Sequence, residues 1–287
     1  MKTILITGGL GQLGISLKRI FNSKYEIISS TRSKNLRAAD IYLDVTNPIL
    51  FKDVLKMTSP DLVINLAALT DVDLCERNPE LAYSINVGGI DNLVNTFNGP
   101  IIHISTDYVF DGESGPNKEK DPTNPLNVYG SSKLASENML LEQSEDSLVI
   151  RANVLYDYAS RSNASFLNWV IHSLEEGKEI NVVEDQWNNP TWTSSLAVVI
   201  DRSIDSGING LLHWGDDDWI NRYEFANKIA DVFNLKKSLI KPIKTSELDQ
   251  TARRPLKGGL DSEFAQAALN LEPPSVEECL QTILEQK

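Results

Sequence analysis

Three groups of residues in this sequence could take part in chemistry. The first is the run TGGLGQLG at residues 7–14, which follows an apolar segment and precedes a helical pattern. Glycines at 8, 11 and 14 allow a tight turn, close approach of a pyrophosphate and close packing of the helix on the strand. The start of that helix offers unpaired N–H groups and the positive end of its dipole to phosphates. The run therefore predicts a dinucleotide site, with a plain structural turn as the alternative.

The second group is YGSSK at residues 129–133. Tyr129 and Lys133 are four residues apart, so both lie on one face of a helix. A tyrosine with the ordinary pKa of about 10 is a poor acid–base catalyst at neutral pH, but a nearby ammonium stabilises the phenolate and lowers that pKa. This spacing is also common on solvated helices. In a chain that has a dinucleotide turn, we favour the catalytic interpretation.

The third group is STDYVFDG at residues 105–112, which follows the expected strand 101–104. The carboxyl ends of parallel strands are where α/β proteins bind ligands, so the Thr106 hydroxyl is expected to face the ligand. There it could donate a hydrogen bond to a carbonyl group that is being reduced. For Asp111 we favour simple capping of the strand end. The polar, Pro- and Gly-rich segment 111–127 is expected to be a surface loop.

The choice of dinucleotide depends on the residues after the second strand. An NAD-binding chain usually places Asp or Glu there, about 20 residues after the glycine turn. This chain has Ser29, Ser30, Thr31 and Arg32 instead. A carboxylate would repel a 2′-phosphate, whereas Arg32 and the hydroxyls can bind one. We therefore predict NADPH, with NADH as the second option; Arg32 could otherwise be an ordinary solvated residue.

A sheet must position these groups, and the first half of the chain has the sequence pattern of a parallel sheet. Short apolar runs alternate with helical stripes, which is typical of a parallel sheet covered on both faces. The expected strands are 2–7, 25–29, 41–43, 61–66, 101–104 and 148–151, and the expected helices include 13–21, 79–98 and 131–143.

The predicted fold class is therefore α/β: a Rossmann-like doubly wound parallel sheet with a smaller, mainly helical C-terminal substrate domain. The predicted boundaries are 1–156 for the NADP-binding domain and 157–287 for the substrate-binding domain. A short segment near 188–213 is free to return to the first domain. In the second domain, strands are expected near 179–183 and 211–214, and helical stripes near 225–233 and 276–283.

Composition excludes several classes of protein. The chain has 287 residues with 27 Lys and Arg against 40 Asp and Glu, a net charge of −13. Such a balance argues against nucleic acid or an anionic membrane surface as a partner. No run of about 18 apolar residues and no signal-peptide pattern is present, so a cytoplasmic protein is expected. The two isolated cysteines and three scattered histidines predict no metal and no disulfide framework.

The motifs together resemble the extended short-chain dehydrogenase/reductase superfamily, through the runs 7–14, 65–68 (NLAA), 105–112 and 129–133. Within it, STDYVFDG, PLNVYG at 125–130 and NPT at 189–191 are similar to the dTDP-4-dehydrorhamnose reductase family. The same strings are similar to the NADP-binding regulatory beta subunit of methionine adenosyltransferase, which residues 212–214 and 223–235 match more closely. The resemblance covers nearly the whole chain.

The resemblance implies roles for individual residues. Tyr129 would donate a proton to the sugar oxygen while NADPH delivers hydride to C4, with Thr106 hydrogen-bonded to that oxygen. Lys133 would bind the nicotinamide ribose and depress the Tyr129 pKa. Besides Lys133 and Arg32, the cofactor-binding residues would be Tyr129 and Gly8, Gly11, Gln12, Leu13, Asp44, Val45, Ala67, Ala68 and Leu69. The substrate would be bordered by Thr70, Val72, Tyr108 and Asn153, and Arg254 would offer charge to the nucleotide diphosphate.

One residue departs from the family pattern. The reductases carry a Trp on the strand that begins at the counterpart of Arg151, and this Trp packs on the sugar. Val154 stands in its place here. Loss of an aromatic platform removes about 1 kcal/mol or more of contact, roughly tenfold in affinity. A different sugar, or a different orientation of it, therefore stays open.

Three functions follow from these observations. The favoured one is NADPH-dependent reduction of a 4-keto-6-deoxy nucleotide sugar, dTDP-4-dehydro-L-rhamnose before others, in polysaccharide biosynthesis. The second is a cofactor-binding regulatory subunit of a methionine adenosyltransferase, and the third is a nucleotide-sugar epimerase or dehydratase. The exact sugar, the base and the oligomeric state are left open, with a homodimer as one option.

Overall fold

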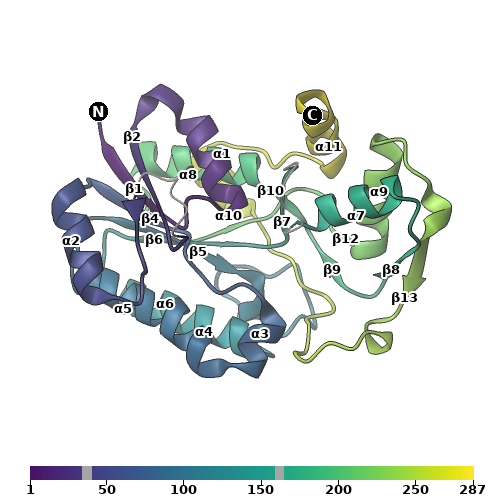
Figure 1. Ribbon diagram of the computed structural model, residues 1–287, viewed down its shortest axis with the longest axis horizontal. Coiled ribbons are helices and arrows are strands. Elements are labelled where there is room, and N and C mark those ends of the chain that lie inside the picture. Colours follow the sequence, from purple (N-terminus) through teal and green to yellow (C-terminus); the bar gives the residue numbers. More distant parts are fainter. Residues whose placement is uncertain (34–40, 159–164) are drawn as a thin grey trace.

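A parallel sheet forms the centre of the molecule. The computed structural model describes residues 1–33, 41–158 and 165–287. In this described part the sheet has seven strands in the order β11-β6-β5-β4-β1-β2-β3 (Figure 1), and every neighbouring pair is parallel. The strands are β1 (Thr3–Thr7), β2 (Glu26–Thr31), β3 (Ile41–Tyr42), β4 (Leu62–Asn65), β5 (Ile101–Thr106), β6 (Leu148–Ala152) and β11 (Gly210–Trp214). The predicted α/β fold is confirmed.

The central strands are apolar on both faces because helices cover both. Residues of β1, β4 and β6 are almost entirely buried. In the register of the sheet, Ile4 lies opposite Ile27 on one side and Leu62 on the other. Removing such side chains from water is the main favourable contribution to the folding of this layer.

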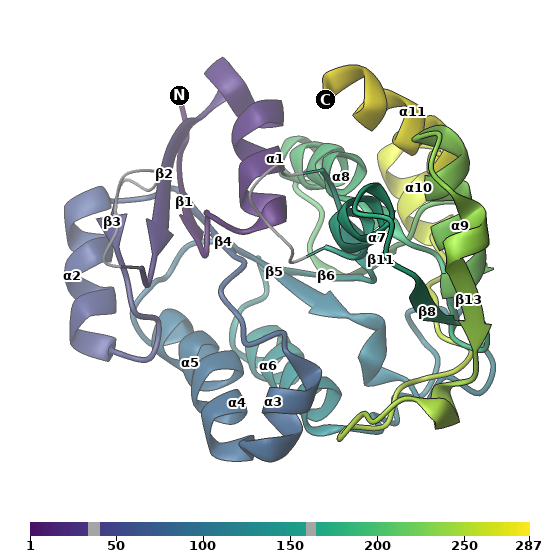
Figure 2. The same ribbon diagram turned by 45° about the vertical axis from the view of Figure 1, so that its right-hand side comes forward.

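Two groups of helices enclose the sheet (Figure 2). One face is covered by α1 (Gln12–Phe21), α8 (Thr193–Ser206) and α10 (Glu263–Leu269), which share a core with the strands. The other face is covered by α2 (Pro48–Thr58), α4 (Pro79–Asn86), α5 (Gly88–Val94) and α6 (Val128–Gln143), with α3 (Val72–Arg77) packed against α6. The doubly wound arrangement leaves the carboxyl edge of the strands open for a ligand.

Two helical details differ from the prediction. The prediction of a single helix over 79–98 is wrong, because α4 ends at Asn86 and α5 runs from Gly88 to Val94. Gly88 and Gly89 form the start of α5, and their low helix propensity favours a break before them. The helix α2 was not predicted. Its signals were Asn47, whose side chain accepts a hydrogen bond from Leu50 N at 3.0 Å, and Pro48 at the first helical position.

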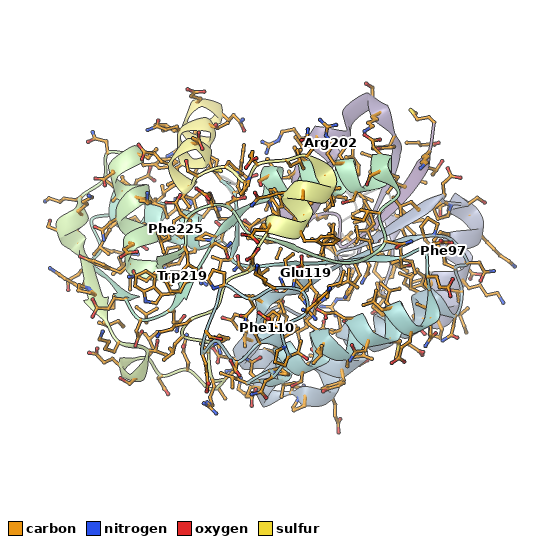
Figure 3. All side chains as sticks on the ribbon, turned by 180° about the vertical axis from the view of Figure 1, so that it is seen from behind. Phe97, Phe110, Glu119, Arg202, Trp219 and Phe225 are labelled. Atoms are coloured by element: carbon orange, nitrogen blue, oxygen red, sulfur yellow. The ribbon has the colours of Figure 1, made fainter. Side chains whose placement is uncertain are left out.

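A second core lies beside the sheet, at the right of Figure 1. It packs α7 (Phe166–Glu175), α9 (Arg222–Val232) and α11 (Val276–Gln286) against the pair β8 (Ile180–Val183) and β13 (Ile240–Ile243). Figure 3 labels Phe225, which belongs to this core, and Phe97, which packs against the core between the sheet and α2, α4, α5 and α6. The remaining short elements are β7 (Leu155–Tyr156), β9 (Trp187–Asn188), β10 (Thr191–Trp192), β12 (Ile220–Asn221), η1 (Asn22–Lys24), η3 (Asp107–Val109), η4 (Lys237–Leu239) and η5 (Thr245–Glu247).

Residues after 156 contribute to both cores. Leu196 of α8, Leu212 of β11 and Leu269 of α10 pack in the core under the sheet. The segment near 188–213 that was expected to return to the first domain contains α8 and most of β11, but α10 lies outside it. Among the described residues, no helix is long and apolar enough to cross a membrane.

Candidate active site

A cavity of about 1100 Å³ lies along the carboxyl edge of the sheet and extends toward the second core. The turn after β1 and the ends of β4, β5 and β6 form one wall, which is where α/β proteins bind ligands. The predicted site residues that line it are Gly8, Gly11, Gln12, Leu13, Arg32, Asp44, Val45, Ala67, Ala68, Leu69, Thr70, Thr106, Tyr108, Tyr129, Lys133 and Arg254. One continuous cavity thus brings together sixteen residues that the sequence placed in separate motifs.

The glycine turn leads directly into α1 at one end of the cavity. A Cβ on Gly14 would lie 2.6 Å from the Gly9 carbonyl oxygen, so only glycine lets the helix start against the turn. Gly11, Gln12 and Leu13 line the cavity where this helix begins. The cradle therefore fits a pyrophosphate, which the amide groups and the dipole of the helix would bind.

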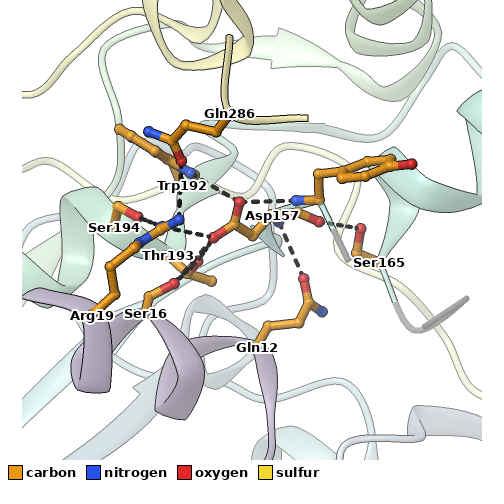
Figure 4. A network of polar contacts seen from close by, with 10 residues as sticks. Gln12, Ser16, Arg19, Asp157, Ser165, Trp192, Thr193, Ser194 and Gln286 are labelled. Carbon is orange, nitrogen blue, oxygen red and sulfur yellow. Dashed lines mark hydrogen bonds and ion pairs between the residues drawn. The ribbon is translucent and has the colours of Figure 1, made fainter. Parts of the chain in front are cut away.

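A network of polar contacts around Asp157 fixes this end of the cavity (Figure 4). The Asp157 carboxylate accepts hydrogen bonds from Ser16 Oγ at 3.0 Å and Thr193 Oγ1 at 2.9 Å. The Asp157 amide donates to Gln12 Oε1 at 3.1 Å, and the guanidinium of Arg19 lies 3.3 Å from the carboxylate. The network joins the first turns of α1 to the start of α8 and to the chain after β7.

The residues that follow β2 and β3 form the other end of the part of the cavity that is expected to bind the dinucleotide. Arg32 is exposed and lines the cavity, as do Asp44 and Val45. The Asp44 carboxylate accepts hydrogen bonds from Thr46 N at 3.0 Å and Thr46 Oγ1 at 2.8 Å, which orders the turn after β3. No acidic residue occupies the end of β2, so a 2′-phosphate would meet Arg32 and not a carboxylate.

Tyr129 stands at the start of α6, in the middle of the cavity wall. The Asn127 side chain accepts a hydrogen bond from Gly130 N at 2.8 Å and so begins the helix. A Cβ on Gly130 would collide with the Tyr108 carbonyl oxygen, so glycine is required for α6 to approach this close. The Tyr108 and Tyr129 rings meet edge to face with centroids 5.8 Å apart. Thr106, from the end of β5, lines the cavity with both.

The electrostatics of Tyr129 differ from the expectation. Burial raises the pKa of Tyr129 above its ordinary value, and a side-chain hydrogen bond with Thr106 acts against this. The predicted lowering by Lys133 does not dominate here, because the Lys133 ammonium is directed to β5. A raised pKa keeps the phenol protonated at neutral pH, which is the form that a proton donor needs.

Lys133 is buried one turn further along α6. Its Nζ donates to the Ile104 carbonyl oxygen at 2.7 Å and lies 3.0 Å from His103 Nε2. Burial lowers the pKa of Lys133 to about 8. The amine is therefore held at the end of β5, beside the place that a ligand along this wall would occupy.

Sequence reasoning missed Asp107. Its carboxylate is buried and accepts hydrogen bonds from Thr106 Oγ1 at 3.3 Å and from Gly259 N at 3.4 Å. Burial raises the pKa of Asp107 to about 6. The available signal was its position directly after Thr106, within a string that ends a buried strand.

Sequence reasoning also missed Arg222, which lines the cavity from the start of α9. Its guanidinium lies over the Phe166 ring at 5.3 Å, and within the described residues it has no hydrogen bond or ion pair. Burial lowers the pKa of Arg222, while the field of Asp107 opposes this. Arg254, by contrast, is paired with Asp73 at 2.9 Å. Arg222 is therefore the cation better placed to receive an anionic ligand.

Aromatic side chains enter the cavity from α7. Phe166 and Trp169 line it and lie with ring centroids 5.6 Å apart. Val154 also lines the cavity and has a φ of 43°, in the left-handed region that β-branched residues rarely adopt. Phe166 and Trp169 thus offer the aromatic surface that Val154 lacks, from a different direction.

Two predicted substrate residues lie off the cavity wall. Val72 begins α3 and does not line the cavity. Asn153 is buried in a network instead, where its Nδ2 donates to Asn189 Oδ1 at 3.0 Å and its Oδ1 accepts from Thr191 Oγ1 at 3.2 Å. Among the residues that the structure describes, no group of three or more His, Cys, Asp or Glu side chains could hold a metal ion.

Comparison with known proteins gives matches that cover 87% of this chain or more. The model of the RmlD substrate binding domain family matches residues 1–287. The dTDP-4-dehydrorhamnose reductase of Aggregatibacter actinomycetemcomitans is 32% identical over 99% of this chain and 98% of its own. The methionine adenosyltransferase 2 subunit beta of Xenopus tropicalis is 31% identical over 87% of this chain and 77% of its own. The crystal structure of dTDP-4-dehydrorhamnose reductase from Bacillus anthracis str. Ames in complex with NADP superposes with a TM-score of 0.91 at 30% identity, covering 100% and 99% of the two chains.

Proposed function

The chain belongs to the family of the RmlD substrate binding domain, and on that basis we propose that it is an NADPH-dependent reductase of a 4-keto-6-deoxy nucleotide sugar. The proposed reaction converts dTDP-4-dehydro-L-rhamnose to dTDP-L-rhamnose, a step toward polysaccharide. The observation that carries the proposal is one continuous cavity in which the glycine turn is followed along the wall by Thr106, Tyr129 and Lys133.

The proposed roles follow from the positions of these side chains. The cofactor, when bound, supplies hydride to the carbonyl carbon. Tyr129 lines the cavity as a protonated phenol and would donate its proton to the carbonyl oxygen, with Thr106 hydrogen-bonded to the same oxygen. Lys133 would contact the ribose beside the carboxyl end of β5. In this structure the Thr106 hydroxyl donates to Asp107 at 3.3 Å, and on substrate binding its hydrogen would turn from Asp107 to the carbonyl oxygen, so Asp107 would act on the reaction only through Thr106.

NADPH is the proposed cofactor, and NADP is bound in the Bacillus anthracis relative. Here the 2′-phosphate would lie beside Arg32, the exposed cation at the end of β2. The remaining predicted cofactor residues, from the glycine turn to Leu69, line the same half of the cavity.

Replacing Arg32 by alanine is expected to raise the KM for NADPH about tenfold and to leave the KM for NADH unchanged. The reason is that a guanidinium–phosphate contact contributes about 1.5 kcal/mol, and NADH has no phosphate at this position. Steady-state kinetics with each cofactor provide the measurement. An equal effect on both cofactors would contradict the role of Arg32.

The other half of the cavity is proposed to bind the nucleotide diphosphate and the sugar. Arg222 and Arg254 supply positive charge there. This explains how a chain with a net charge of −13 can bind a dianion: two placed guanidinium groups determine the local field. Phe166 and Trp169 are proposed to pack against the base or the sugar, in place of an aromatic residue at position 154.

Replacing Arg222 by methionine is expected to raise the KM for the nucleotide sugar about tenfold to a hundredfold, because a charged hydrogen bond contributes about 1.5–3 kcal/mol. Stability should not fall, since the substitution removes a partly buried cation that lies on the Phe166 ring and has no counterion, and it retains the apolar stem. Arg202→Met, on an exposed residue of α8 (Figure 3), is the matched control. An unchanged KM in Arg222→Met would show that the diphosphate binds elsewhere.

The test of the function is turnover by the purified protein. With NADPH and dTDP-4-dehydro-L-rhamnose, the nicotinamide absorbance should fall and dTDP-L-rhamnose should form. Absence of turnover with every 4-keto nucleotide sugar tried would contradict the proposal. Cofactor that copurifies in stoichiometric amount would favour an epimerase or dehydratase instead.

A regulatory role is the second candidate, because the Xenopus tropicalis subunit beta is 31% identical to this chain. Specific capture of a methionine adenosyltransferase catalytic subunit, together with no turnover of any sugar, would favour it. The presence of Tyr129, Lys133 and Thr106 in the wall of the cavity supports the reductase.

Three broader assignments stay proposals. The first is a division into a cofactor part, residues 1–156 with the returning segment, and a substrate part, residues 157–287. The second is a cytoplasmic location, supported by the two buried, unpaired cysteines, which suit a reducing compartment. The third is a homodimer that has no nucleic acid partner.

A further inference from the structure

We propose that His103 is a positioning residue, which holds Lys133 in place for the cofactor and connects it to Thr7 at the start of the dinucleotide turn. His103 lies on β5 and is not part of the cavity wall. The inference rests on the proposed function only in assigning Lys133 to the cofactor.

Four buried side chains form a continuous chain of contacts across the sheet. Lys133 Nζ lies 3.0 Å from His103 Nε2, and His103 Nδ1 lies 3.0 Å from Asn65 Nδ2. Thr7 Oγ1 donates to Asn65 Oδ1 at 2.6 Å. Their residues are 2%, 1%, 3% and 0% exposed, respectively. They come from α6, β5, β4 and β1, so the chain connects the helix that carries Tyr129 to the strand that ends in the glycine turn.

The hydrogen bonds of Thr7 determine the orientation of the whole chain. Thr7 Oγ1 accepts from the backbone N–H of Leu66 at 3.2 Å and of Ala67 at 3.1 Å, so its own hydrogen is directed to Asn65 Oδ1. The Asn65 amide nitrogen therefore faces His103 Nδ1 and donates to it. Burial and the charge of Lys133 hold the pKa of His103 well below its usual range, so the ring is neutral. A neutral ring that accepts at Nδ1 carries its hydrogen on Nε2.

The Nε2–H group of His103 faces α6. It lies 3.1 Å from Ser136 Oγ and 3.0 Å from Lys133 Nζ. Ser136 Oγ donates to the Lys133 carbonyl oxygen at 2.7 Å and can therefore accept from Nε2. Lysine has a long, flexible side chain. The neutral amine of Lys133 accepts from His103 Nε2–H and donates to the Ile104 carbonyl oxygen, so these two groups give it a defined position.

The same contact affects the charge of Lys133. An N–H group pointed at the amine favours its neutral form, in the same direction as burial, which lowers the Lys133 pKa to about 8. Glu137, one turn along α6, acts in the opposite direction, and its carboxylate is paired with Arg151 on β6. Loss of His103 would thus both free the Lys133 side chain and raise its pKa.

The first test measures the Kd of NADPH by fluorescence, without any sugar, across a range of pH. In the unaltered protein the affinity should fall as pH rises through the Lys133 pKa. His103→Leu should move this fall to higher pH, because the Nε2–H group no longer opposes the charged form of Lys133, so at pH values above 8 the variant should bind NADPH more tightly than the unaltered protein. His103→Gln, whose amide N–H can occupy the place of Nε2–H, should restore part of the original pH dependence. His213→Leu is the control, because His213 is an equally buried histidine on β11 that contacts Asn117 and Arg151 instead.

The second test needs no substitution. The ¹⁵N spectrum of the His103 ring in the intact protein should show a hydrogen on Nε2 and none on Nδ1. A hydrogen on Nδ1 would overturn the proposal, as would a folded His103→Leu protein whose NADPH affinity and pH profile match those of the unaltered chain. If His103→Leu does not fold, the spectrum decides. Both readouts are independent of sugar turnover, so a failure of the proposed reaction would not be mistaken for a failure of this inference.

Discussion

Replacing Tyr129 by phenylalanine is expected to lower kcat for sugar reduction by about 10²- to 10⁴-fold, the usual contribution of a positioned general acid. Phenylalanine keeps the ring and its edge-to-face packing on Tyr108, with centroids 5.8 Å apart in the present structure. It removes only the O–H group, which burial keeps protonated. The KM for NADPH should change little, because the glycine turn and Arg32 are untouched. Steady-state and single-turnover oxidation of NADPH give the measurement.

The control for this substitution is Tyr83→Phe, on the outer side of α4, where the tyrosine is 42% exposed and does not line the cavity. It should leave kcat unchanged. Tyr108→Phe tests which of the two tyrosines donates the proton, because Tyr108 also lines the cavity. If Tyr108 were the proton donor, its variant and not Tyr129→Phe would lose activity. That result would reverse the proposed assignment.

Much of the fold could be predicted because buried parallel strands are apolar runs whose ends are marked by turns. Six of the strands of the sheet were expected near their observed positions. The strand at 211–214 was expected too, but not its place beside β6, where Leu212 lies opposite Ile150. Pairing between residues so far apart in sequence leaves no local pattern. The same limit applies to α10, whose Leu269 reaches the core under the sheet only through the tertiary fold.

The residues of the candidate site likewise divide into those that could be predicted from the sequence and those that could not. Residues that belong to contiguous motifs, such as the glycine turn and Tyr129, could be placed from spacing and from the family resemblance. Arg222 and Phe166 could not, because they come from separate helices of the second core and belong to no motif. The pKa of Tyr129 was expected to be lowered by Lys133. It is raised because the effect of burial is larger, and burial depends on the packed cavity and not on helical spacing.

Replacing Glu137 by glutamine is expected to lower the free energy of unfolding by about 3–5 kcal/mol, the usual cost of removing one partner of a buried ion pair. The Glu137 carboxylate accepts from Arg151 Nη2 at 2.7 Å and from its Nε at 3.1 Å, and the two side chains are 1% and 4% exposed. The substitution leaves the Arg151 charge buried without a counterion. Since Glu137 is on the same helix as Tyr129 and Lys133, activity should be lost at a lower urea concentration as well. Urea unfolding followed by circular dichroism gives the measurement.

Two comparisons separate the loss of the ion pair from the loss of any carboxylate. Glu263→Gln removes an exposed partner of Lys118, 3.0 Å away and 76% exposed, and should change stability by less than about 1 kcal/mol. The double variant Glu137→Leu with Arg151→Met should recover most of the stability lost in Glu137→Gln, because it buries two apolar side chains and no unpaired charge. If the double variant were as unstable as the single one, packing around α6 and not charge would be the stabilising feature. Recovery of stability together with NADPH binding would show that the pair holds α6 in place without any direct part in the chemistry.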